Sequence, residues 1–135
     1  MLGRTVIGYE VQKILALADW LTAENSKLET RNSKLLIAGY GEGGLLALHA
    51  AALDQRISGA LVSSYFDARN QLWREPIYRN LFGILREFGD AELASLIHPR
   101  ALFIEHSSPP EIAGPPAART GRSGGAAPGK ITLPD

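Results

Sequence analysis

The chain has 135 residues and no cysteine, which excludes disulfides, thiolate metal sites and thiol catalysis. Fourteen basic and fourteen acidic side chains cancel, so no global field recruits nucleic acid or an anionic membrane. The length allows one domain at most, and no apolar run reaches the roughly 18 residues of a membrane span. Since the first residues lack a secretory signal, we expect a cytoplasmic protein without nucleic-acid or membrane partners.

Apolar residues at helical spacing predict an amphipathic helix at residues 8–24. The residues on its apolar face are Val11, Ile14, Leu15, Leu17, Ala18 and Leu21. Three short apolar runs follow and predict parallel strands at residues 35–39, 59–63 and 101–105. The first run is wholly apolar, which is typical of a strand that is covered on both faces of a sheet.

A second helix is predicted at residues 43–53, where three consecutive alanines allow close packing against a sheet. The mixed segment after the second strand predicts a loop around Pro76 and helical turns at 78–88 and 91–97. His98 ends that segment, because a proline disfavours helix in the residue before it. The order of these elements predicts an α/β fold with a parallel sheet flanked by helices.

The composition changes after the third strand. Residues 109–135 are rich in proline, glycine and alanine, which predicts an irregular tail separate from an α/β domain at residues 1–108. Three strands make a narrow sheet with two open edges, and no strand precedes the first helix. We therefore expect either a segment of a larger α/β domain, or a sheet that self-association or missing chain segments complete.

The turn at residues 39–44, GYGEGG, carries the main functional signal. Gly39, Gly41 and Gly44 match the dinucleotide pattern G-x-G-x-x-G between a strand and a helix. Such a loop brings backbone amides and the positive helix end against a pyrophosphate. Asp67 lies about where a ribose-binding carboxylate is expected. One interpretation is therefore a dinucleotide-binding module.

The same turn is in register with the nucleophile elbow, G-x-S-x-G, at Gly39, Gly41 and Gly43. Its central residue is Gly41, which has no side-chain oxygen and cannot form an acyl-enzyme. Glu42 follows at the start of the helix, where a carboxylate favours the helix dipole whatever its function. In a third interpretation the glycines serve only tight packing, in a noncatalytic segment used for binding or assembly.

Three phrases around this turn support the elbow. They are Asp19-Trp20-Leu21 before the first strand, Ala51-Ala52-Leu53-Asp54-Gln55-Arg56-Ile57 after the second helix, and PRALFIEH at residues 99–106. Together they resemble the central part of an α/β-hydrolase from the branch of dienelactone hydrolases, acetyl xylan esterases and prolyl oligopeptidase-like peptidases. The resemblance covers about residues 5–111. It implies a partial α/β-hydrolase-like sheet and an ester or amide as the small-molecule ligand.

The chain departs from that family at the catalytic triad. Gly41 takes the place of the nucleophile, and no histidine follows His106, although the family's histidine comes from a later loop. The family's acid is expected in the loop after the third strand, where Glu111 is the only carboxylate, and Glu105 and His106 are further candidates at that edge. We therefore predict an esterase-like or peptidase-like protein that is inactive as this chain.

The remaining polar groups suggest no further chemistry. Ser63 and Ser64 end the second strand at the same edge, and the sequence places no base to activate them. His49, His98 and His106 are not three or four residues apart, so no metal site is predicted, and no cofactor is expected.

Overall fold

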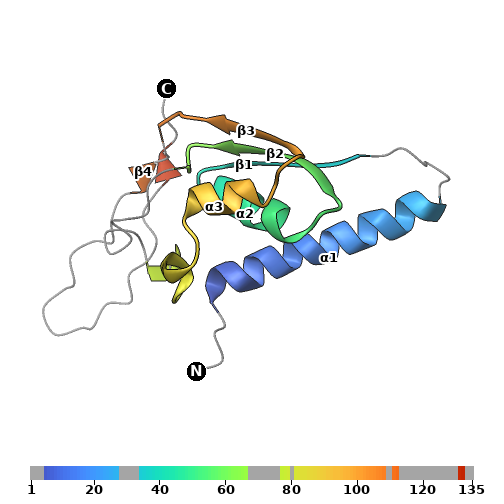
Figure 1. Ribbon diagram of the computed structural model, residues 1–135, viewed down its shortest axis with the longest axis horizontal. Coiled ribbons are helices and arrows are strands. Elements are labelled where there is room, and N and C mark those ends of the chain that lie inside the picture. The colour runs from blue at the N-terminus through green and yellow to red at the C-terminus, as the bar shows by residue number, and fades with distance from the viewer. Residues whose placement is uncertain are drawn as a thin grey trace, which may run out of the picture.

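The computed structural model describes residues 5–27, 34–66, 77–79, 81–108, 111–112 and 131–132. Its centre is a parallel sheet in the order β1 (Leu35–Tyr40), β2 (Ile57–Ser63) and β3 (Ala101–Glu105). In Figure 1 these strands run side by side along the top of the view, and the helices lie below them. The α/β fold and the three parallel strands predicted from the apolar runs are confirmed.

The helices occur where the periodicity indicates them. They are α1 (Val6–Lys27), α2 (Glu42–Leu53) and the short α3 (Asp90–Ser95), with 3-10 turns η2 (Ile77–Arg79) and η3 (Ile84–Arg86). The two predicted long helices are therefore confirmed, each slightly longer than expected. The predicted helical turns are reduced to η2, η3 and α3, and the loop around Pro76 lies outside the described residues.

The central helix α2 forms the middle of the core. It packs directly on β1 and β2, while α1 and α3 pack against it. Leu45, Leu48, Ala50 and Ala51 are completely buried, and the alanines let the helix axis approach the sheet. Burial of these side chains is the main favourable term that holds the layers together.

The N-terminal helix α1 buries a narrower face than the sequence predicts. Ile7, Val11 and Ala18 are buried, but Leu17 is 54% exposed, so its predicted place in the core is wrong. The reason is that α1 packs on α2 and leaves an apolar cavity of about 110 Å³ beside β1. The cavity is lined by Ile14, Leu17, Ala18, Leu21, Leu35, Leu36, Ile37 and Ile57.

Only one face of the sheet is covered by the described residues. Residues of β1 and β3 alternate between partly covered and exposed along each strand. Leu36 and Phe103, which point to the open face, are 68% and 66% exposed. The two-sided burial expected from the apolar run at 35–39 is therefore wrong, because α2 covers a single face.

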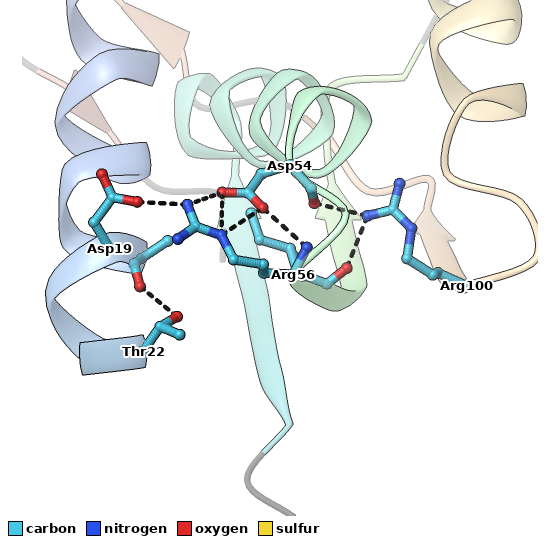
Figure 2. Close-up of polar contacts among 7 residues, drawn as sticks. Asp19, Thr22, Asp54, Arg56 and Arg100 are labelled. Atoms are coloured by element: carbon cyan, nitrogen blue, oxygen red, sulfur yellow. Dashed lines mark hydrogen bonds and ion pairs between the residues drawn. The ribbon is translucent and has the colours of Figure 1, made fainter. Parts of the chain in front are cut away.

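Charged side chains tie the elements together at the amino ends of the strands (Figure 2). The Arg56 guanidinium lies 2.6 Å from Asp19 on α1 and 2.6 Å from Asp54 after α2. Arg100 Nη1 donates to the backbone oxygens of Asp54 (2.9 Å) and Ile57 (2.8 Å). Hydrogen bonding to Arg56 holds the pKa of Asp54 below its ordinary value, and the same contact raises the pKa of Arg56.

The tail contains a second, minimal sheet. β4 (Glu111–Ile112) and β5 (Ile131–Thr132) pair antiparallel. The expectation of a wholly irregular tail is therefore wrong for these two segments, since a two-residue ladder needs little apolar burial. The rest of residues 109–135 lies outside the described residues. None of the described helices combines the length and apolar character that a bilayer crossing requires.

Candidate functional site

The corner between β1 and α2 is occupied by Gly41. Its backbone angles are φ 55° and ψ −116°, and it caps the amino end of α2. A positive φ of this kind strains residues that carry a Cβ atom. The Gly41 N–H donates to the backbone oxygen of Ser63 at 2.9 Å, which fixes the corner to the end of β2. The sequence prediction that Gly41 lies at the tip of the corner with a positive φ is confirmed.

The neighbouring glycines differ in whether a side chain would fit at their positions. A Cβ atom at Gly39 would overlap the carbonyl group of Gly43, and one at Gly44 would lie 2.8 Å from the backbone oxygen of Ser63. A Cβ atom at Gly43 would meet no atom within 4 Å. Close approach of α2 to the strands therefore requires Gly39 and Gly44, but not Gly43.

Glu42, in the first turn of α2, is paired with the η2 segment. Its Oε1 forms a close ion pair with the Arg79 guanidinium and accepts a hydrogen bond from the Tyr78 hydroxyl at 3.3 Å. Burial raises the pKa of Tyr78, and the negative charge of Glu42 raises it further. The carboxylate thus holds η2 against the corner, and its position at a helix start is also favoured by the dipole.

A chain of hydroxyl groups begins at the carboxyl ends of β2 and β3. The buried Ser63 Oγ donates to Glu105 Oε2 at 2.5 Å and lies 3.3 Å from Ser107 Oγ. The parallel register places Ser63 directly beside Glu105, which explains the contact. Sequence reasoning missed this pair because it considered only histidine as a base. No local sequence pattern would have indicated it, because the contact depends on the register between β2 and β3.

Ser64 continues the chain in a strained backbone conformation. Its φ is 58°, which is uncommon for a residue other than glycine. The Ser64 N–H donates to the backbone oxygen of Glu105 at 3.0 Å, and its hydroxyl bonds closely with that of Ser107. The backbone oxygen of Ser108 accepts from the hydroxyls of Ser64 (3.2 Å) and Tyr40 (2.9 Å). Contacts with the end of β3 and with the segment after it therefore hold this conformation.

The other predicted site residues lie elsewhere or are not described. His49 is buried in the middle of α2, where its Nδ1 lies 2.8 Å from Leu45 O, and His98 is an exposed residue before β3. His106 is exposed directly after β3, and Glu111 begins β4. Asp67 lies outside the described residues. Among the described side chains, no three histidine or acidic groups gather as metal ligands would.

The corner brings together a helix amino end and a buried serine hydroxyl. The amino end of α2 offers backbone N–H groups and the positive end of a helix dipole, which favour a carbonyl oxygen or an anion. Ser63 is only 7% exposed and its hydroxyl already donates to a carboxylate, so an external substrate has little access to it. The cavity beside α1 has an almost wholly apolar lining and belongs to the packing of that helix.

Comparison with known proteins finds no similar sequence or structure. No protein-family model, no curated protein and no solved structure matches the chain.

Proposed function

We propose that this chain is a noncatalytic protein of the α/β-hydrolase type, which binds a small ester or amide without cleaving it. The observation that carries the proposal is Gly41 at a corner with φ 55° and ψ −116°. A nucleophile elbow holds its central residue in a sharp, strained turn between a strand and a helix. Glycine occupies such a corner with little strain, and it supplies no nucleophile.

The surrounding groups support binding over turnover. Acyl transfer needs a hydroxyl and a base within hydrogen-bond reach of each other and of the substrate. Gly41 has no hydroxyl, and Ser63, whose hydroxyl donates to Glu105, is buried. The amino end of α2 is the group that we expect to hold a carbonyl oxygen.

Dinucleotide binding is the second candidate, and one observation favours it. The sterically required Gly39 and Gly44, with Gly41 at positive φ, follow the G-x-G-x-x-G spacing, whereas Gly43 has free space. Against this candidate, the Gly41 N–H already donates to Ser63 O and is not available to a pyrophosphate. We therefore rank this function second.

Two measurements on the purified full chain test the proposal. With p-nitrophenyl acetate we expect no release of p-nitrophenolate above the buffer rate, together with amide chemical-shift changes at residues 41–44. Phe82→Ala is the control, because Phe82 is exposed and lies outside this turn, so the variant should leave both results unchanged. Ester hydrolysis that follows the protein through purification would overturn the proposal. Micromolar binding of NAD(H) would replace it with the dinucleotide function.

A further inference from the structure

The open face of the sheet, defined as the outward-pointing residues of β1, β2 and β3, is ordered into three rows by the strand register. The rows are Leu36, Gly59 and Ala101, then Ala38, Leu61 and Phe103, and then Tyr40, Ser63 and Glu105. The first two rows carry only apolar side chains or glycine, and the third is polar. Leu36, Leu61 and Phe103 are 68%, 41% and 66% exposed. Parallel sheets are normally covered on both faces, and none of the described helices packs on this one.

Large and small residues occupy opposite corners of the apolar part. Leu36 lies on β1 and the small Ala101 lies on β3 in the same row. In the next row the order is reversed, with Ala38 on β1 and Phe103 on β3. When a second copy of this surface is turned by 180° about an axis parallel to the strands and laid on the first, each large corner residue therefore faces a small one.

We propose that a second copy of this chain covers the open face, related by a two-fold axis parallel to the strands. In this arrangement β1 lies over β3 of the second copy, so that Leu36 meets the second copy's Ala101 and Phe103 meets its Ala38. Leu61 faces its own counterpart at the axis. Interdigitation of large and small side chains is how packed layers reach interior density. Sheets pack face to face about 10 Å apart and within about 30° of alignment, which this pairing allows.

Area and charge agree with a second copy as the occupant. A specific interface buries roughly 500 Å² or more from each copy, and the exposed Leu36, Leu61 and Phe103 would form the apolar centre of such an interface. The formal net charge of the chain is zero, so two copies do not repel each other. We therefore expect a reversible dimer that forms as concentration rises.

Sedimentation across a concentration series tests the dimer. The unaltered chain should pass from monomer to dimer, and Phe103→Glu should weaken association at least tenfold, because it places a charge at the interface. Phe82→Glu is the matched control, since Phe82 is 75% exposed but precedes η3, away from the sheet. A chain that stays monomeric throughout, or equal effects of the two variants, would overturn the proposal.

Exchanging the sizes of the side chains at positions 38 and 103 tests the proposed two-fold axis. Ala38→Phe alone should weaken the dimer by steric conflict with Phe103, and Phe103→Ala alone should weaken it by leaving a void. The double variant exchanges the two sizes and should restore association. Since the chain has no cysteine, Leu61→Cys can also be joined specifically by a short bismaleimide, whereas Phe82→Cys should not be. Failure of both the restoration and the cross-link would refute the two-fold arrangement.

Discussion

The two ends of the sheet are built by different physical means. At the amino ends of the strands, long charged side chains bridge separate elements, with Arg56 joining α1 to the segment after α2 and Arg100 reaching that segment from the start of β3. At the carboxyl ends, glycines let the backbone come close, and short hydroxyls bond one another. The first end is held by charged side chains, whereas the second is the edge at which ligands of open α/β sheets bind.

The family resemblance is concentrated at the charged end. Asp19 belongs to the first of the three phrases, Asp54 and Arg56 belong to the second, and Arg100 belongs to the third. These residues meet in one cluster of ion pairs and hydrogen bonds, shown in Figure 2. This part of the proposed resemblance therefore concerns contacts that hold helices and strands together. It says less about reactive groups, which would lie at the opposite end.

The largest loss of stability should come from adding a side chain at Gly39, where α2 closely approaches β1. Gly39→Ala places a methyl group into the carbonyl of Gly43, so the helix must move away from the strand. We expect a loss of about 3 kcal/mol or more in the free energy of unfolding, measured by urea denaturation. Gly43→Ala is the control and should change stability by less than about 1 kcal/mol. Equal losses in the two variants would contradict the close contact.

The next largest loss of stability should come from replacing Arg100 at the amino ends of the strands. Arg100→Met keeps much of the side-chain volume but leaves the backbone oxygens of Asp54 and Ile57 without this donor. We expect a loss of about 2 kcal/mol in urea denaturation. Arg86→Met, at an exposed position in η3, should change stability by less than about 0.5 kcal/mol. A neutral Arg100→Met would mean that solvent replaces these hydrogen bonds at no cost.

A smaller effect is expected at the corner itself. Gly41→Ser imposes a Cβ atom on a backbone with φ 55°, which should cost about 1 to 2 kcal/mol in the free energy of unfolding. The variant should fold and still release no p-nitrophenolate from p-nitrophenyl acetate, because no histidine follows His106 to take the serine proton. Gly43→Ser, two residues further along the chain, is the control. A gain of esterase activity in Gly41→Ser alone would refute this account.

The smallest effect should appear in acid. Arg56 lowers the pKa of Asp54 in the folded chain, so ionised Asp54 stabilises the fold above its ordinary pKa of 3.8. That contribution is lost as the pH falls below this value and through the folded pKa. Asp54→Asn should therefore cost less than about 1 kcal/mol at neutral pH, and the difference from the unaltered chain should shrink below about pH 4. A difference that does not vary with pH would count against the ion pair.

The sequence predicted those parts of the fold that depend on local pattern. The strands, α1 and α2 follow from apolar runs and helical spacing, and the Gly41 corner follows from glycines placed between a strand and a helix. The exposure of Leu17 and of Leu36 could not be predicted, because apolar character does not tell which faces find a partner.

The candidate site was less predictable than the fold. The Ser63 and Glu105 pair depends on the register between two strands that are far apart in sequence, which no local pattern fixes. The pairing of Glu42 with Arg79 depends on where the η2 segment returns to the corner. Long-range placement of this kind requires the tertiary structure.

The connections between the strands also have a consequence for the order of assembly. β1, α2 and β2 are consecutive and pair within residues 35–63, whereas β3 joins only after the long segment that contains η2, η3 and α3. Closing a long loop costs more entropy than closing a short one, so the first unit should form earlier in folding. Arg100 precedes β3 and bonds back to the turn between α2 and β2, so these hydrogen bonds should form only when β3 docks. In pulsed hydrogen exchange, amides of β1 and β2 that bond each other should gain protection before those of β3.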